Sequence, residues 1–202
     1  GDHSFAAAAD DVELAYLRLV PLTAQNFFTN VSGADGGYGH HLFWDAKGVA
    51  TSTSTECFLS VASSSDWLWE DSVFEVDAAQ GDAFTLVDAR RWTFDRLQFS
   101  VVGPTITWAS LFTFVTTASL GCIVKNCDFV SGRAANGLIT KVYTRMAGGS
   151  ILLVRNCYLN GTSTPTATNI ETGFDATVGI ELAENYITGD ATTQGGLLIT
   201  LA

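Results

Sequence analysis

Positive charge is scarce in this sequence. Its 202 residues include 10 Lys and Arg, three of them Lys, against 21 Asp and Glu, so the formal net charge is −11 and the sequence pI is near 4.4. A nucleic-acid partner would need a basic patch to neutralise its phosphates. The charge balance therefore argues against nucleic acid, and it suits solubility in a salty or extracellular setting.

Long apolar runs and leader signals are also missing. No apolar stretch reaches the roughly 18 residues of a membrane span, and no basic segment precedes an apolar one at Gly1. Because the sequence starts without Met, we expect a processed or excised piece of a longer protein. Charged residues make up 15% of the chain, against roughly 25% in an ordinary domain, so much of the surface should be Ser, Thr, Asn and Gly.

Familiar catalytic motifs are absent as well. The sequence has no GxSxG, no HExxH and no phosphate-cradling glycine loop. His40 and His41, with Asp35 and Asp45 nearby, form the one cluster of histidines and carboxylates, inside the Gly-rich segment "NVSGADGGYGHH" and just after it. Neighbouring residues of a strand point opposite ways, which argues against a metal shared by the two histidines unless the loop bends sharply between them. We therefore expect a solvated loop here, with no metal and no cofactor.

What the sequence does contain is an internal repeat. Four stretches superimpose, with phase markers at Leu97, Cys127, Cys157 and Asn185: "FDRLQF" (94–99), "VKNCDF" (124–129), "VRNCYL" (154–159) and "LAENYI" (182–187). The markers therefore follow one another at nearly constant spacing. A period of about 30 residues is too short for a domain and long enough for one coil of a solenoid.

Each repeat predicts two short strands joined by a bend. In the first, Phe94 precedes two polar residues, and Leu97 and Phe99 then share a face. The jump of three positions breaks the period of two, so the chain has to bend there. Asn126 and Asn156 hold the second bend position, and Asn tolerates the left-handed conformation that a tight corner needs. The inward residues should stack in two columns: Leu97, Cys127, Cys157 and Asn185 in one, and Phe99, Phe129, Leu159 and Ile187 in the other.

Further apolar runs lie between the repeats, at 111–115, 138–143 and 197–201. They bring the number of short strands to about three per repeat, as in a parallel β-helix. The recurring bend with its stacked Asn and inward aliphatic neighbours resembles the right-handed, single-stranded parallel β-helix of the pectate-lyase-like superfamily.

The resemblance covers roughly residues 92 to 189 and implies an all-β fold. It extends one coil earlier if Ser65, Asp66, Trp67 and Trp69 align, one full repeat ahead, with Asp95, Arg96, Leu97 and Phe99. That superfamily includes polysaccharide lyases and hydrolases, phage tailspikes and non-catalytic surface proteins. The architecture therefore does not select a function.

The N-terminal segment does not follow the repeat. We predict an N-terminal arm or cap over 1–50 and the β-helix over 51–202. Ser4 to Val20 is Ala-rich and runs up to Pro21, which predicts a capping helix, although Val12, Leu14 and Tyr16 also alternate. Such a cap would cover an open hydrophobic coil end. At the other end, "GGLLITLA" lacks a polar cap, so either the sequence stops within the fold or another subunit covers the last coil.

Two of the four cysteines, Cys127 and Cys157, occupy the same inward position in consecutive repeats. Stacked strands lie about 4.8 Å apart, which a disulfide would permit. The alternative, which we favour, is a buried stack of reduced thiols that behave as small hydrophobic groups. No CxxC or Cys–His spacing predicts a zinc site.

The outward position after the bend reads Gln98, Asp128, Tyr158 and Tyr186 along the stack. A sugar chain could lie along this row, with the tyrosines as stacking platforms and Asp128 as an acid. Glycoside hydrolysis needs two carboxylates about 5 to 9.5 Å apart, and the row offers one. Asp95 beside Lys125 predicts a cross-strand charge pair. A lyase would use a base such as Lys125 or Arg155, but no acidic calcium cluster accompanies them.

Two classes of function remain. The first is a non-catalytic structural or assembly subunit on a virion surface, such as a capsid decoration protein or a bacteriophage tailspike segment that forms a homotrimer. The second is an extracellular polysaccharide lyase, hydrolase or glycan-binding module. The short stack and the sparse catalytic inventory favour the first. The expected partners are copies of the chain itself, a capsid or tail protein, and in the second class a surface polysaccharide.

Overall fold

The structure is a computed structural model that describes residues 5–7, 9–20, 28–30, 34–46, 56–60, 64–76, 80–101, 107–114, 121–130, 138–139, 143–144, 151–155, 157–161, 179–184 and 186–189. Every regular element within these ranges is a β-strand. Every strand pairing among them is parallel. The expected all-β class is therefore confirmed.

The larger of the two main sheets has twelve strands, whose neighbours follow one another in chain order. Two strands span its full width, β9 (Leu68–Val76) and β12 (Thr93–Val101). Elsewhere each pass of the chain contributes two shorter strands on either side of a bend: β2 (Glu13–Ala15) and β3 (Arg18–Leu19), β5 (Tyr38–His40) and β6 (Phe43–Ala46), β14 (Cys122–Lys125) and β15 (Asp128–Val130), β18 (Ile151–Arg155) and β19 (Tyr158–Gly161), and β20 (Gly179–Ala183) and β21 (Tyr186–Gly189).

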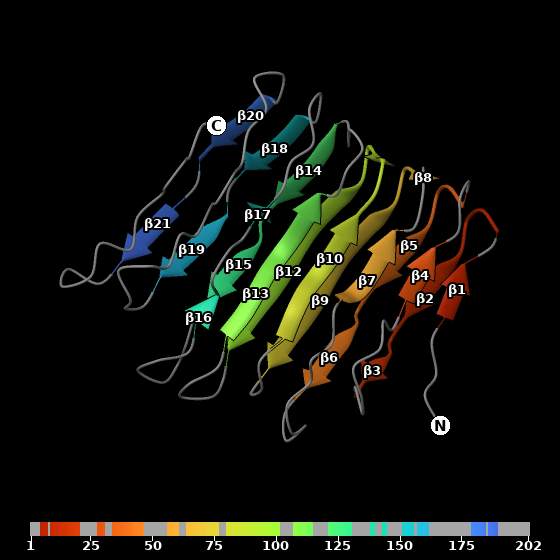
Figure 1. The fold of residues 1–202 in the computed structure, drawn as a ribbon, viewed down its shortest axis with the longest axis horizontal. Helices are drawn as coiled ribbons and strands as arrows, with labels where there is room; N and C mark the ends of the chain where they lie inside the picture. Colours follow the sequence, from red (N-terminus) through yellow and green to blue (C-terminus); the bar gives the residue numbers. More distant parts are fainter. Residues whose placement is uncertain are drawn as a thin grey trace.

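The smaller main sheet has seven strands, again in chain order: β1 (Phe5–Ala7), β4 (Phe28–Asn30), β7 (Glu56–Ser60), β10 (Gln80–Leu86), β13 (Thr107–Phe114), β16 (Leu138–Ile139) and β17 (Tyr143–Thr144). A two-stranded sheet pairs β8 (Ser64–Ser65) with β11 (Ala89–Arg90). The chain alternates between the two main sheets, and Figure 1 shows the strands side by side from β1 and β2 at one end to β20 and β21 at the other. Parallel neighbours cannot be joined by a tight hairpin. From β1 to β18, each return to the larger sheet passes through a strand of the smaller one.

Aromatic side chains fill the space between the two main sheets. Phe94 and Phe99 of β12 are fully buried, and both contact Phe112 of β13 edge-on, with ring centroids 4.8 and 5.8 Å apart. Phe74 of β9 stacks on Phe99 at 4.8 Å, while Phe84 of β10 stacks on Phe112 at 5.6 Å. Such pairs add to the free energy of burying their large apolar areas. One aromatic core therefore holds the two main sheets together.

A bend with left-handed backbone recurs in the larger sheet. Six residues at the equivalent position have φ between 48° and 56°: Tyr16, His41, Asp71, Arg96, Asn126 and Glu184. The predicted bend between Phe94 and Leu97 is confirmed, as is the left-handed conformation of Asn126. Asn156 and Asn185 lie outside the described residues. A second corner has φ values of 55° to 74°, at Asp11, Gly36, Asp66, Arg91 and Gly121. Left-handed backbone at non-glycine residues is costly, so its recurrence reflects the demands of the turn.

The predicted stacking of the repeats is confirmed in its register. Phe99 pairs with Phe129, Phe129 with Leu159, and Leu159 with Ile187. Leu97, Cys127 and Cys157 are all buried. Cys127 and Cys157 are free thiols, so the disulfide alternative is not realised. Burial raises the pKa of Cys127 well above its usual value, because the interior disfavours a thiolate.

The predicted N-terminal helix is wrong. The segment from Ser4 to Val20 contains the strands β1, β2 and β3, and Leu14 and Leu19 are buried. These strands pair with β4, β5 and β6, so the alternation seen in the sequence prevails over the alanine content. The larger sheet continues from β5 and β6 into β9, across residue 50. The division into two domains at residue 50 stays a prediction.

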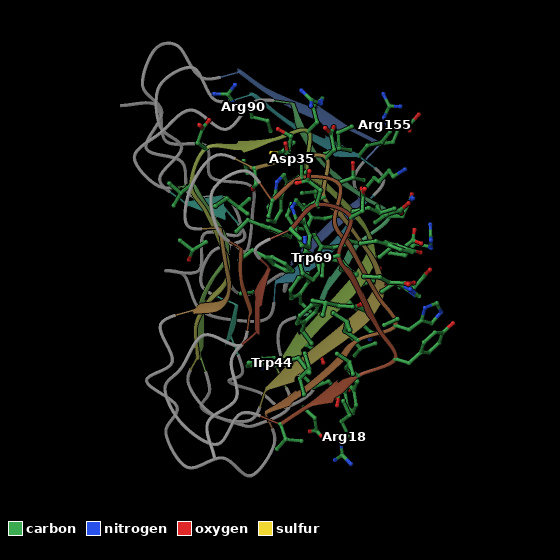
Figure 2. All side chains as sticks on the ribbon, turned by 90° about the vertical axis from the view of Figure 1, so that its right-hand side faces the viewer. Arg18, Asp35, Trp44, Trp69, Arg90 and Arg155 are labelled. Atoms are coloured by element: carbon green, nitrogen blue, oxygen red, sulfur yellow. The ribbon has the colours of Figure 1, made fainter. Side chains whose placement is uncertain are left out.

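The Gly-rich segment is the predicted loop only in part, since residues 34–37 are irregular but Tyr38–His40 form β5. A Cβ atom on Gly37 would collide with the ring of Trp67, and one on Gly39 would collide with the ring of Trp69. Glycine there makes room for two of the largest buried side chains. Figure 2 shows Trp69 and Trp44 on the side of the larger sheet that faces the smaller one, while Arg18 and Arg155 project away from it.

The proposed alignment of the coil before residue 92 is wrong, because that coil is shorter than the repeat. Phe99 pairs with Phe74 and Phe94 with Trp69, five positions out of the predicted phase. Trp67 and Trp69 therefore precede the bend, whereas the prediction set them level with Leu97 and Phe99. Between β5 and β9 the full spacing of the repeat applies, since Tyr38 pairs with Leu68.

Candidate functional site

Charged side chains line the outer face of the larger sheet where it bends. The position just before the bend is occupied in register by His40, Glu70, Asp95, Lys125 and Arg155. These residues follow the inward column of Trp69, Phe94 and Val124, so the period of two turns them outward. We name Glu70, Asp71, Asp95, Arg96 and Lys125, on β9, β12 and β14, the charged ladder.

Arg96 is the centre of the charged ladder. Its guanidinium donates two hydrogen bonds to Asp71, of 2.6 Å from Nε and 2.9 Å from Nη2, and one of 2.8 Å to Glu70. A further bond of 2.9 Å goes to Asp95, so one cation joins three carboxylates. Hydrogen bonding to Arg96 lowers the pKa of Asp71 and raises that of the guanidinium. Bidentate pairing of this kind fixes geometry as well as charge.

Asp95 is the buried member of the ladder, with 5% of its surface exposed. Its carboxylate accepts hydrogen bonds from Arg96 and from the amide of Asn126, the latter at 2.8 Å. Lys125 Nζ lies 3.2 Å from the same carboxylate, which confirms the predicted cross-strand pair. A buried carboxylate needs such donors to offset the loss of hydration. The side chain of Asp95 therefore joins β12 to β14.

The second corner repeats this chemistry between the same two passes of the chain. Arg91 Nε and Nη2 each donate a bond of 2.6 Å to Asp66, on the preceding pass. Both residues have left-handed backbone, as do Arg96 and Asp71. Hydrogen bonding to Arg91 lowers the pKa of Asp66. Each corner thus carries an arginine that clamps the aspartate of the preceding pass.

The nearest carboxylate to the two histidines comes from the N-terminal strand β2. His40 Nε2 lies 2.9 Å from Glu13 Oε1, on the adjacent strand β2. Asp45 instead accepts bonds of 2.5 and 3.1 Å from Arg18, and Asp35 accepts one from the backbone of Ser65. Asp35 and Asp45, which are near the histidines in the sequence, are therefore hydrogen-bonded to other residues in the structure.

Tyr38 connects the histidines to the charged ladder. Its hydroxyl donates a hydrogen bond to Glu70, and its ring stacks on His40 with centroids 4.2 Å apart. The bond to Glu70 raises the pKa of Tyr38 to about 12, because a phenolate beside that carboxylate is disfavoured. Polar contacts therefore run along the outer face from β2 to β14.

The residues of the predicted glycan row follow the same bend in the larger sheet. Gln98 pairs with Asp128, Asp128 with Tyr158, and Tyr158 with Tyr186, so the four residues are neighbours in register. Gln98 is half-buried and Asp128 is exposed. The side chains of Tyr158 and Tyr186 lie outside the described part of the structure. A binding role for this row stays a prediction.

Sequence reasoning missed most of the charged ladder and its link to the histidines. Glu70 and Asp71 were not aligned with Asp95 and Arg96, because the preceding pass was placed five positions out of phase. A signal was present: "LWEDSVFEV" (68–76) and "TFDRLQFSV" (93–101) share an aromatic residue, two polar residues and an apolar alternation. The partnership of Glu13 with His40 has no such signal, since the alanine content of the segment before residue 20 favours a helix.

Chemically, the ladder is a set of acids neutralised by nearby donors. Among the described residues, no group of three or more His, Cys, Asp or Glu side chains is placed to hold a metal ion. Within the same ranges, no helix is long and apolar enough to cross a bilayer. Comparison of the chain with protein-family models, curated proteins and solved structures found no match.

Proposed function

We propose that this chain is a right-handed parallel β-helix that serves as a non-catalytic structural or assembly subunit. Three features support the architecture: all described pairings are parallel, strands follow chain order within each main sheet, and the left-handed corners recur in register. Right-handed crossovers are the rule for parallel strands joined through another layer. The spacing of the corners also fits a solenoid with coils of about 30 residues.

The observation that carries the structural role is the state of the acids around Arg96. Glu70, Asp71 and Asp95 share one guanidinium, and Asp95 has two further donors. A general acid must hold a proton near neutral pH, whereas the pKa of Asp71 is lowered. Acids held in this way join adjacent strands, and an exposed network of several charges contributes more than an isolated pair does.

The N-terminal edge of the larger sheet offers the surface for assembly. In the part of the chain that is described, β2 and β3 have strand neighbours on one side, β5 and β6. Tyr16, with 75% of its surface exposed, and Val20, with 47%, lie beside these strands. An open sheet edge with apolar side chains favours pairing with another chain. The predicted apolar strand at 197–201 lies outside the described residues.

A virion surface is the setting in which we place this role, as a capsid decoration protein or a tailspike-type segment that forms a homotrimer. An acidic chain with a net charge of −11 and a rigid stack of strands suits an exposed assembly. Closed homo-oligomers hide an apolar edge by symmetry. The edge then contacts either a second copy or a capsid or tail protein.

Light scattering of the purified protein tests this proposal. We expect a closed oligomer, and we expect Tyr16→Lys combined with Val20→Lys to convert it to a folded monomer. Asp128→Lys is the matched control, because it also changes the net charge by two units but alters an exposed residue of an inner strand, β15. A parent protein that is monomeric, and stays so with purified virion proteins, would contradict the assembly role.

A second candidate function is binding or cleavage of an extracellular polysaccharide. The observation in its favour is the register of Gln98, Asp128, Tyr158 and Tyr186, which are neighbours on adjacent strands. Sugar rings stack on tyrosines, and a carboxylate accepts hydrogen bonds from hydroxyl groups. Retention of an acidic polysaccharide by the parent and its loss in Tyr158→Ala would support binding. Turnover of the polysaccharide with ordinary enzyme kinetics would replace the structural proposal.

A further inference from the structure

Two histidine side chains converge at the bend after β5. His40 is the last residue of β5, and His41 follows it with a left-handed backbone, φ 52°. That change of backbone turns both rings toward one point, although they are adjacent in sequence. The Nδ1 atoms of the two rings lie 2.7 Å apart. The exclusion of a shared site by strand geometry does not apply here, because the chain bends between the two residues.

Neighbouring side chains fix the orientation of both rings. His40 is buried, with its ring stacked on Tyr38 at 4.2 Å and edge-on to Tyr16 at 5.4 Å. His41 is exposed and stacks on Tyr16, with centroids 4.8 Å apart. The planes of the two imidazoles are 81° apart. The pair is therefore held in position before any ligand arrives, which lowers the entropic cost of binding.

The contact with Glu13 sets the tautomer of His40. A carboxylate accepts hydrogen bonds, so Nε2 of His40, at 2.9 Å from Glu13 Oε1, carries the proton. In a neutral imidazole the other nitrogen, Nδ1, then has a free lone pair directed at His41. Without a ligand, His41 Nδ1 donates its proton to that lone pair. If the proton of His41 moves to its own Nε2, both Nδ1 lone pairs point into the same space.

A carboxylate behind a histidine is the usual support of a metal-binding imidazole. Metal-ligating histidines donate their second ring N–H to a carboxylate or carbonyl, which orients the ring and raises its basicity. His40 reproduces this arrangement, because its Nε2 faces the carboxylate of Glu13 while its Nδ1 faces Nδ1 of His41.

The separation of the nitrogens distinguishes between classes of metal. Ligands about 2.0–2.1 Å from a metal lie about 2.9 Å apart at a right angle and about 3.3–3.4 Å apart at a tetrahedral angle. The observed 2.7 Å is the length of the hydrogen bond between the two rings, so the nitrogens need to separate by about 0.2 Å for a right angle and by about 0.6 Å for a tetrahedral angle. The right angle therefore requires the smaller rearrangement. Square-planar or tetragonal sites with nitrogen ligands favour Cu²⁺ or Ni²⁺, and Cu²⁺ binds more tightly at a given site.

We propose that His40 and His41 form a Cu²⁺-binding site in which their Nδ1 atoms occupy two adjacent equatorial positions and Glu13 supports His40 from behind. The remaining positions are open to water or small oxygen and nitrogen donors. A site with two protein ligands is compatible with the lack of any three-residue metal cluster in the described ranges. The net charge of −11 favours the approach of a cation.

Copper titration of the full chain tests this proposal. All samples carry His3→Ala, because His3 is the remaining histidine of the sequence. Cu²⁺ is supplied with excess glycine, which competes for weak binding to surface carboxylates. We expect one tightly bound Cu²⁺, pulsed electron paramagnetic resonance showing two imidazole ligands, weaker binding of Zn²⁺ and a higher melting temperature with copper, since a ligand of the folded state stabilises it.

His41→Asn removes one imidazole and keeps a residue that tolerates the left-handed backbone. It should weaken Cu²⁺ binding by at least about tenfold and leave at most one imidazole signal, and Glu13→Gln should weaken binding by about 10- to 100-fold. Far-ultraviolet circular dichroism checks that each variant is folded. The proposal is overturned if the parent does not retain Cu²⁺ against glycine, if His41→Asn binds as tightly as the parent, or if Zn²⁺ binds more tightly than Cu²⁺.

Discussion

Replacing Phe99 by Ala probes the core that the two main sheets share. Phe99 is fully buried, stacks on Phe74 of the adjacent strand, and meets Phe112 of the smaller sheet edge-on. The substitution removes the ring from contacts within one sheet and between the two. Its effect therefore reports on the aromatic core as a whole.

The expected loss of stability follows from burial and from the space left behind. Full burial of a Phe side chain is worth about 1.5–3 kcal/mol. An unfilled cavity adds to this, because the rigid strands on either side limit collapse, and measured Phe→Ala losses are about 3–5 kcal/mol. We expect a loss in that range. Since a whole domain is stable by only about 5–15 kcal/mol, the variant should be close to the limit of folding.

Urea unfolding followed by tryptophan fluorescence measures this effect, because Trp44, Trp67, Trp69 and Trp92 are buried and report the loss of the core. Gln98→Ala is the matched control, since Gln98 is the preceding residue and lies on the outer face. It should cost less than about 1 kcal/mol. Equal losses in the two variants would refute the assignment of inner and outer faces.

Four further predictions concern charge and protonation. Arg96→Ala should lower the urea midpoint more than Arg90→Ala, which removes a local ion pair. Because Arg96 lowers the folded pKa of Asp71, that carboxylate stabilises the fold above its unfolded pKa of about 3.9. This contribution is lost as the pH falls through the lower folded pKa. The parent should therefore lose more stability on acidification than Arg96→Ala does. Burial raises the pKa of Cys122 to about 12, so this thiol should react with iodoacetamide at pH 8 only on unfolding. Fast labelling of Cys122 in the native protein would contradict its burial. The pKa of Tyr38, raised to about 12 by Glu70, should appear as a late step in an ultraviolet titration that Tyr38→Phe removes.

The register of the strands after residue 92 could be predicted from the sequence because the repeat there carries unambiguous markers. Cys127 and Cys157 follow Asn at 126 and 156, and the flanking apolar residues leave one phase that keeps the inward positions apolar, with Asn185 as the exception. A slip by one residue would turn Phe129 outward, so the hydrophobic pattern determines the pairing.

The strands before residue 92 could not be predicted in the same way. Their inward positions include Gly39 and Ser72, which carry no hydrophobic signal, and the step from Trp69 to Phe94 is shorter than the steps that follow it. Gly39 is acceptable in the core only because the ring of Trp69, on the neighbouring strand, occupies its side-chain space. Compensation of this kind between residues far apart in sequence is not visible in a local pattern.

The candidate sites follow the same division. The pair of Asp95 and Lys125 could be predicted, since it lies between repeats in the correct phase. The clamp of Asp71 by Arg96 could not be predicted, because it depends on the shortened step between β9 and β12. The contact of Glu13 with His40 could not be predicted either, because it depends on the N-terminal strand β2. Convergence of His40 and His41 also needs the left-handed bend, which a reading as an extended strand excludes.

The shortened step before β12 shows where the chain tolerates a change of length. Ala46 pairs with Val76 in the larger sheet, and Glu56 pairs with Asp82 in the smaller one. The chain thus advances ten positions from Ala46 to Glu56 but only six from Val76 to Asp82, while both sheets stay in register. Most of the shortening is therefore taken up in passing from one sheet to the other. This crossing is a natural point for inserting a foreign peptide, such as a tag or an epitope, without shifting a strand on either side.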